Sequence, residues 1–418
     1  MPNMNWYRGN LHMHSFWSDG NDFPEMVADW FKRNGYQFIA FTEHDQHQTG
    51  ERWFRCDPET SQGQAAAQGE LLDRYLQRFG EDWVKHREAN GVTEVLLKQL
   101  FEYRHLFEES ERFLMINGEE VTTTWGQRDK GQTHWINVFN TPSAIPPQHA
   151  ENGTSIDGMG RTFAEAEKAA SESGREVLTY LNHPNFVWNA TAEDIAAVTN
   201  LRHLEIHTAL NSCNTYGDEM HASAERIWDI ANTIRLAKME GEIIYGIATD
   251  DCHAYAHHHR LALSALPGRA WIMVHAKRLT PELIMSSISD GQFYSSTGVT
   301  LSAVETEPAG IRLQIEPLAG VSYRTEFIGT RRGCDLGSEA LTDAEGNPVR
   351  TTGRYSNSIG CVLTVAEGLT PSYTFEGDEL YVRAAVISDA PHPNPTAHGD
   401  TQKAWTQPFR PGQVTLQF

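Results

Sequence analysis

The sequence predicts an α/β fold followed by a smaller β-sandwich-like domain. In the first fifty residues the amphipathic helix "FPEMVADWFKRNG", which Gly35 ends, is followed by the apolar strand "FIAFT". Alternation of strands and helices is typical of parallel α/β domains, and barrels of this class hold their sites at the carboxyl ends of the strands. From about residue 300 the pattern changes to short β-like runs between turns. We therefore expect one domain over residues 1–299 and a β-sandwich-like domain over residues 300–418.

The remaining elements follow in chain order. Residues 51–112 are charged and have helical patterns, so we expect a helical insertion that covers the pocket. Further strands are predicted in "FLMINGEEV", "HWINVFN", "REVLTYLNHP", "LRHLEIHT" and "EIIYGIATDDCH". The segment "SAERIWDIANTIRLAKMEG", between the last two of these, predicts an amphipathic helix. In the second domain the predicted strands are "GIRLQIEPL", "CVLTVAEGL" and "LYVRAAVIS".

Composition excludes several classes of function. Apolar residues make up 39% of the 418-residue chain, which is typical of a well-packed globular protein. A net charge of -21 disfavours a broad nucleic-acid-binding surface. Five dispersed cysteines without a CxxC pair argue against a disulfide framework and against a cysteine-built zinc site. We find neither a transmembrane segment nor the apolar core of a signal peptide, so we expect a cytoplasmic protein with no membrane contact. The oligomeric state stays open.

The stretch "NLHMHSFWSDG" near the start of the chain combines two histidines and an aspartate. Side chains two positions apart on a strand share one face, so His12 and His14 point the same way, with Asp19 close behind. Imidazole and carboxylate groups gathered in this way suit a metal ion, although histidine pairs at this spacing also occur on solvated strands.

Further metal-ligand residue types recur at the ends of later predicted strands. They are His44, Glu120, His134, His183, Asp251 and His253. The spacing from Gly118 favours Glu120 over its neighbour Glu119, and Asp251, unlike Asp250, shares a strand face with His253. In an α/β barrel these strand ends converge, so together with His12, His14 and Asp19 they predict one metal cluster. The alternative is a solvated polar rim.

The ordered set "HMHSFWSDG", "FTEHD", "NGEEV", "HWINVF", "NHP" and "TDDCH" resembles the PHP (polymerase and histidinol phosphatase) superfamily over residues 6–265. The resemblance implies a distorted seven-stranded (β/α) barrel. Glu43 is a departure, since the family more often has aspartate there. The insertion at 51–112 and the C-terminal domain lie outside the family's common core.

Carried over by position, the resemblance implies a trinuclear metal site. It assigns His12, His14, Glu120 and Asp251 to the first metal, Glu120, His134 and His183 to the second, and Asp19, His44 and His253 to the third. Such mixed ligands suit two to three divalent ions of zinc, manganese or iron. The expected nucleophile is a metal-bound hydroxide, and no GxSxG motif offers a competing nucleophile.

Other polar residues have less defined expected roles. Glu205 and His207 either form hydrogen bonds to metal ligands or make a structural pair. Arg260 is a candidate anion contact, and Arg128 and Lys130 also lie between ligand motifs.

Together these features predict a phosphoesterase that acts on a small phosphomonoester, a phosphodiester or a short oligonucleotide. The same metals would also serve hydrolysis of a carboxyl ester, carbamate or amide. A hypothesis of a different class is a non-catalytic binding protein with a relic barrel, which predicts broken ligand sets.

Overall fold

The protein has a mixed α/β fold, with most of its strands in two large sheets. The computed structural model describes residues 4–57, 70–126, 132–255, 266–412 and 416–417. The nine-stranded sheet has the order β20 (Cys361–Glu367), β17 (Tyr323–Arg331), β22 (Glu379–Pro391), β23 (Thr401–Thr406), β14 (Phe293–Ser296), β13 (Trp271–Ala276), β1 (Asn5–Asn10), β2 (Phe38–Ala40) and β6 (Leu114–Ile116). The six-stranded sheet has the order β12 (Tyr245–Thr249), β11 (His203–Thr208), β10 (Leu178–Leu181), β8 (Gln132–Phe139), β7 (Gly118–Trp125) and β9 (Gln148–Ala150).

The two large sheets do not close into a barrel among the described residues. Two single bridges, Met13 to Cys252 and His44 to Glu120, connect them beyond the ends of β1, β2 and β12. On its other side β1 pairs with the antiparallel strand β13, and the sheet then continues through β14 into the C-terminal strands. The expected α/β class is therefore confirmed, whereas the closed seven-stranded barrel is not seen, because this edge of the sheet extends into the C-terminal region.

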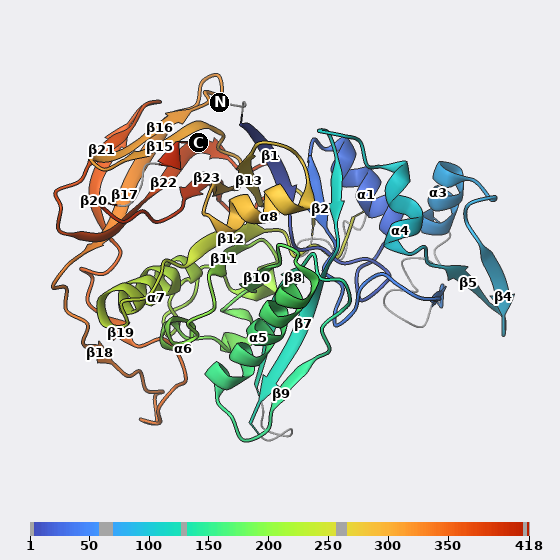
Figure 1. The fold of residues 1–418 in the computed structure, drawn as a ribbon, viewed down its shortest axis with the longest axis horizontal. Coiled ribbons are helices and arrows are strands. Elements are labelled where there is room, and N and C mark those ends of the chain that lie inside the picture. Colours follow the sequence, from blue (N-terminus) through green and yellow to red (C-terminus); the bar gives the residue numbers. More distant parts are fainter. Residues whose placement is uncertain (1–3, 58–69, 127–131, 256–265, 413–415, 418) are drawn as a thin grey trace.

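Helices cover the six-stranded sheet on its outer face (Figure 1). They are α5 (Ser155–Ser173), α6 (Ala192–Ala197) and α7 (Ala224–Lys238). Their apolar side chains form one core cluster with residues on this outer face of the sheet, such as Ile136, Val138 and Leu204. The helices α1 (Pro24–Arg33) and α8 (Pro281–Ser289) contribute to separate apolar clusters on the nine-stranded sheet. This packing fixes the strand ends from which the polar residues project.

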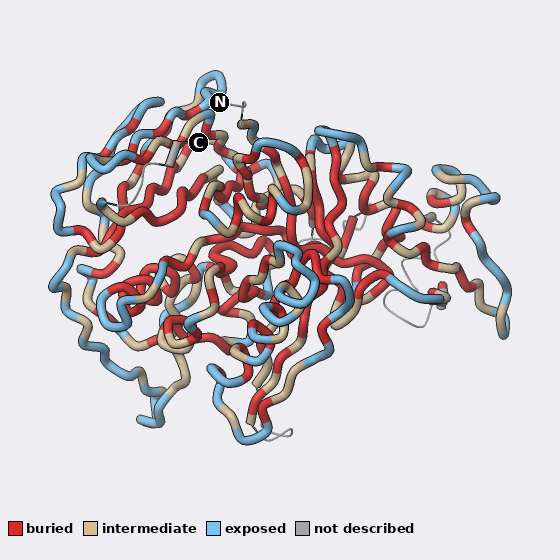
Figure 2. Tube along the Cα trace, in the orientation of Figure 1, coloured by how far each residue is buried: buried red, intermediate tan, exposed pale blue. Residues whose placement is uncertain are grey.

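The C-terminal region forms two layers of sheet. A four-stranded sheet contains β15 (Leu301–Glu307), β16 (Gly310–Ile315), β21 (Ser372–Thr374) and β24 (Leu416–Gln417). Its inward side chains, among them Val304 and Leu313, share a core cluster with Phe327 and Val386 of the nine-stranded sheet. Buried and exposed residues alternate along β15 and β16, as expected for a sheet with one covered face, whereas Figure 2 shows the segment carrying β18 (Ser338–Glu339) and β19 (Arg354–Tyr355) largely exposed.

The insertion after residue 50 is only partly helical. It contains α3 (Glu70–Phe79) and α4 (Leu100–Tyr103), and also a three-stranded antiparallel sheet of β3 (Trp53–Arg55), β5 (Val92–Leu96) and β4 (His86–Ala89). Figure 1 shows these elements at the end of the molecule opposite the C-terminal strands. The Asn90-Gly91 pair is the sequence signal for this hairpin. Both residues take positive φ, which the two-residue turn between the paired strands requires.

Among the described residues, no helix has the length and apolar content needed to cross a membrane.

Burial of His203 makes the stability of this fold depend on pH. The side chain lies in the core at the start of β11, and burial lowers its pKa to about 4. The folded chain therefore keeps His203 neutral, while the unfolded chain takes up a proton below about pH 6.5, so stability falls as the pH drops from 6.5 towards 4. Between pH 7 and pH 5 we expect His203 to account for about 2 kcal/mol of this loss. Urea unfolding of the His203→Gln variant should show a correspondingly smaller loss; an unchanged pH dependence would contradict this assignment.

Candidate metal centre

Eight of the nine residues predicted as metal ligands converge where the two large sheets meet. The chain segments that carry them follow β1, β2, β10 and β12 or, for Glu120, lie within β7. The eight residues are His12, His14, Asp19, His44, Glu120, His183, Asp251 and His253. Most of them line a cavity of about 580 Å³, while His12 and His14 are fully buried.

Glu120 lies at the centre of the cluster and faces four imidazoles. Its Oε1 lies 3.5 Å from Nε2 of His12 and 3.3 Å from Nε2 of His183. Its Oε2 lies 3.4 Å from Nε2 of His14 and 3.1 Å from Nδ1 of His44. Each carboxylate oxygen is therefore placed between two ring nitrogens, an arrangement that suits a carboxylate bridging two cations.

Asp251 approaches two of these histidines from the end of β12, an edge strand of the six-stranded sheet that also contains Glu120. Its Oδ1 lies 3.3 Å from Nε2 of His12 and 3.4 Å from Nε2 of His14. The residue follows the end of β12 with φ of 49°, a left-handed conformation that aspartate tolerates better than most residues. Its neighbour Asp250 points away from the cluster and accepts hydrogen bonds from the backbone N–H groups of Arg269 and Ala270.

Asp19 forms the outer part of the cluster at the mouth of the cavity. Its side chain is 53% exposed, yet three histidines surround it. Oδ1 lies 3.4 Å from Nε2 of His253 and 3.5 Å from Nδ1 of His14, and Oδ2 lies 3.4 Å from Nε2 of His44. The predicted third ligand set, Asp19 with His44 and His253, is thus brought together, with His14 beside it.

The contacts fit ligands that share an ion better than they fit direct hydrogen bonds. Nε2 of His12 and Nε2 of His14 are buried and have no hydrogen-bond partner. Two atoms that each lie about 2.0–2.1 Å from one tetrahedral ion are about 3.4 Å apart, which is close to the nitrogen–oxygen separations around Glu120 and Asp251. Unpaired buried polar atoms are rare in native proteins. The donor set therefore fits divalent metal ions, and mixed nitrogen and oxygen ligands admit zinc, manganese or iron.

The charges at the site also favour bound cations. Burial alone would raise the pKa of Glu120, but positive charge on His44 and His12 holds that pKa well below its usual range. Burial likewise disfavours the protonated form of His44, yet Glu120 and Asp19 raise its pKa to about 10. The carboxylates are therefore ionised at neutral pH. In a buried site they need positive charge, which protonated imidazoles supply in the absence of metal and which divalent ions would supply when the imidazoles bind them in the neutral form.

Glu205 holds the ring of His12 in place from behind. Its Oε1 lies 3.0 Å from Nδ1 of His12, and its Oε2 accepts a hydrogen bond from the backbone N–H of His183 at 2.7 Å. A carboxylate on the far nitrogen of a metal-binding imidazole fixes its tautomer and orientation. Of the two roles considered for Glu205, the hydrogen bond to a predicted ligand is the one observed. His207 instead stacks on Trp405, outside the cluster.

His134 lies outside the cluster. It points from β8 towards α5, where its Nε2 lies 2.7 Å from Oγ of Ser155 and its ring stacks on Trp125. Side chains of a strand alternate between its two faces, and it is Thr133 and Trp135 that line the cavity. The second predicted ligand set therefore retains Glu120 and His183 but not His134.

We expect the His134→Gln variant to keep the metal content and turnover of the wild type, because His134 does not reach the cluster. The His183→Gln variant should lose turnover by more than the about 10–100-fold typical of changes just outside a metal site. Elemental analysis and initial rates on both variants test this contrast. Equal losses of metal and turnover in the two variants would show that His134 belongs to the site.

One wall of the cavity is apolar and was not anticipated from the sequence. Trp135 and Phe186 lie side by side with ring centroids 5.2 Å apart, and Leu210 adds to this wall, while Cys213 lines the cavity next to Asp251. Cys213 belongs to the loop after β11, and no motif had marked it. The candidate anion contact Arg260, together with Arg128 and Lys130, lies outside the described residues.

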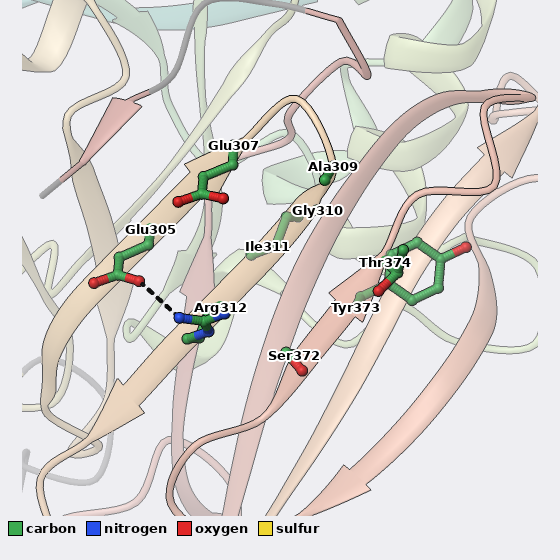
Figure 3. Close-up of a pocket in the computed structure, with 9 residues that line it drawn as sticks. All are labelled: Glu305, Glu307, Ala309, Gly310, Ile311, Arg312, Ser372, Tyr373 and Thr374. Atoms are coloured by element: carbon green, nitrogen blue, oxygen red, sulfur yellow. Dashed lines mark ion pairs between the residues drawn. The ribbon is translucent and has the colours of Figure 1, made fainter.

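A second concavity lies far from these residues, on the four-stranded sheet. Figure 3 shows Glu305 and Arg312 facing each other across β15 and β16, with 3.7 Å between Oε2 of Glu305 and Nη1 of Arg312. Its volume is about 120 Å³, and its lining contains no histidine or cysteine. This concavity therefore lacks the imidazole groups that the metal-ligand cluster provides.

Comparison with known proteins identifies only a remote structural likeness. No protein-family model matches the chain, and no curated protein matches it in sequence. Among solved structures, it is similar to a two-domain protein from Bacteroides vulgatus ATCC 8482 described as containing a predicted PHP-like metal-dependent phosphoesterase. The two chains are 14% identical, with a TM-score of 0.38 over 99% of this chain and 96% of the other. The function is therefore argued from the site alone.

Proposed function

We propose that the protein is a metal-dependent hydrolase of the PHP type, a phosphoesterase for a small phosphomonoester, a phosphodiester or a short oligonucleotide. The observation that carries this proposal is the pair of buried carboxylates, Glu120 and Asp251, each placed between several imidazole nitrogens. Such a set would hold two to three divalent ions. Its convergence from distant parts of the chain also disfavours a relic barrel with broken ligand sets.

When bound, divalent ions acidify water and offset negative charge on phosphoryl oxygens and on the leaving group. The chain's own residues then have distinct tasks. Glu205 orients His12, while Ser18 lies 3.2 Å from Nδ1 of His14 and orients that ring. Asp19 stands at the open side of the cluster, where a substrate enters, and interacts with His253.

The apolar wall makes one side of the cavity chemically different from the side that carries the carboxylates and histidines. A substrate whose hydrolysable group lies at the carboxylate–histidine side places its organic part against Trp135 and Phe186. Contact with these rings would exclude water from that side of the substrate and bind aromatic or apolar groups.

A second candidate function is hydrolysis of a carboxyl ester, carbamate or amide. Within the part of the chain that the structure describes, no lysine or arginine lines the cavity. Phosphoesterases often place such cations on the oxygens of the substrate, whereas a neutral ester or amide does not need them.

The two candidates can be distinguished with substrates that share one leaving group. We would compare bis(4-nitrophenyl) phosphate, 4-nitrophenyl phosphate and 4-nitrophenyl acetate, before and after removal and return of metal. Phosphoester turnover that is lost with a chelator and restored by metal supports the main proposal. Metal-dependent turnover of the acetate alone would assign the second candidate. If no substrate is turned over with any added metal, the hydrolase proposal is wrong.

A further inference from the structure

Cys213 places a buried thiol beside two of the predicted metal ligands. The residue is 1% exposed, and its Sγ lies 3.6 Å from Oδ2 of Asp251. Nε2 of His183 lies 4.0 Å from the same oxygen and 3.3 Å from Oε1 of Glu120. The ligand atoms of His183, Cys213 and Asp251 all lie within 4.8 Å of one another, close enough for one ion.

The loop that carries Cys213 is tied to the loop that carries His183. Nδ2 of Asn185 donates a hydrogen bond to the backbone oxygen of Asn214 at 3.1 Å, and Nδ2 of Asn214 donates one to the oxygen of Asn185 at 3.4 Å. These reciprocal bonds join the residues next to both ligands. The approach of the thiol to His183 is therefore part of the folded structure.

The thiol occurs where the predicted ligand set is incomplete. His134 points to α5, so the set of Glu120 and His183 lacks its third protein ligand. Next to this set, Nε2 of His12 is buried without a hydrogen-bond partner and lies 3.3 Å from Oδ1 of Asp251. This unsatisfied ring nitrogen points independently to a cation beside Asp251.

We propose that Cys213 is a thiolate ligand of a metal ion held also by His183 and Asp251, an inference that rests on the proposed metal-dependent function. Binding replaces the S–H bond with a metal–sulfur bond and releases the proton to solvent. A soft thiolate favours zinc or iron over magnesium or manganese. The inference therefore narrows the metals expected at this site to thiophilic ions.

Cys252 provides a matched control. It is fully buried and directly follows Asp251, but its Sγ lies 3.3 Å from the hydroxyl of Tyr255 and is not part of the ligand groups. A sulfur signal from the site should therefore depend on Cys213 and not on Cys252.

Cobalt(II) substitution tests the inference without measuring activity. The apoprotein is loaded with Co²⁺, bound cobalt is quantified, and the sulfur-to-cobalt charge-transfer band in the near ultraviolet is recorded for the wild type, Cys213→Ser and Cys252→Ala. X-ray absorption on the zinc-loaded wild type adds a measurement that needs no variant, because a thiolate gives a zinc–sulfur distance of about 2.3 Å. We expect the band in the wild type and Cys252→Ala, its loss in Cys213→Ser, and the zinc–sulfur distance.

Bound cobalt without a charge-transfer band, together with zinc spectra that contain only nitrogen and oxygen ligands, would overturn the role of Cys213 and leave the metal-dependent function intact. A band that persists in Cys213→Ser would also overturn it. A wild-type chain that binds neither cobalt nor zinc would instead refute the proposed function and, with it, this inference.

Discussion

Replacing Glu120 with glutamine is expected to abolish most of the hydrolytic activity. The carboxylate faces His12, His14, His44 and His183, so its removal takes away both the central negative charge and a ligand shared by the whole cluster. We expect kcat/KM to fall on the order of 10³-fold, equivalent to about 4 kcal/mol of transition-state stabilisation. Bound metal should fall in the same samples. Initial rates and elemental analysis of Glu120→Gln measure both effects.

The adjacent Glu119 offers a close control. Its Oε1 accepts a hydrogen bond from the backbone N–H of Ile145 at 2.7 Å, on the side of β7 away from the cluster. Burial raises the pKa of Glu119 to about 8, so glutamine is a close substitute for the protonated side chain. Glu119→Gln should retain metal and turnover. Wild-type activity in Glu120→Gln, or an equal loss in Glu119→Gln, would show that the site has been placed on the wrong residue.

The second large effect is on stability, at a buried ion pair between α7 and β22. Asp229 accepts hydrogen bonds from Nε and Nη2 of Arg383 at 2.9 and 2.7 Å, and Arg383 is almost fully buried. Removing Asp229 leaves the buried Arg383 only its longer contact with Glu225, 3.3 Å from Nη2 to Oε2, so Asp229→Ala should lower the free energy of unfolding by about 3–5 kcal/mol. Denaturant unfolding measures this loss. A double variant with Arg383→Met should recover part of it, because the unpaired charge is then gone.

An exposed pair provides the comparison for this prediction. Asp378 pairs with Arg331 at the surface, and its replacement by alanine should cost at most about 1 kcal/mol. If Asp229→Ala were no more destabilising than Asp378→Ala, the C-terminal strands would not depend on the contact with α7 as we describe.

Local patterns predicted individual elements better than their pairing. The helices α1 and α7 and the strands β2, β10 and β12 follow directly from amphipathic and apolar runs in the sequence. The pairing of β14 with β23, which joins residues more than a hundred positions apart, has no local signal. It depends on tertiary packing, and for that reason the open nine-stranded sheet was not foreseen. The Asn90-Gly91 pair, in contrast, is a local indication of a hairpin. It was not recognised because the charged residues around it favoured a helix.

For the site too, local sequence patterns predicted some residues, while the positions of others depend on tertiary packing. Seven of the eight ligands that the structure brings together follow strand ends, where the fold sets the direction of the side chains, and Glu120 lies within β7. His134 has the same parity along β8 as Ile136 and Val138, which pack against the helices, so the apolar pattern already indicated its outward face. Cys213 could not be found from sequence, because bonds between Asn185 and Asn214 set its position.

Metal content measured together with turnover tests the central claim most directly. Elemental analysis of the purified wild-type protein, combined with phosphoester turnover, should give two to three zinc, manganese or iron ions per chain and an active enzyme. Both should be lost in His14→Ala, whose ring lies between Glu120 and Asp251. A wild-type protein that holds no metal, and that stays inactive after zinc, manganese or iron is supplied, would contradict the account.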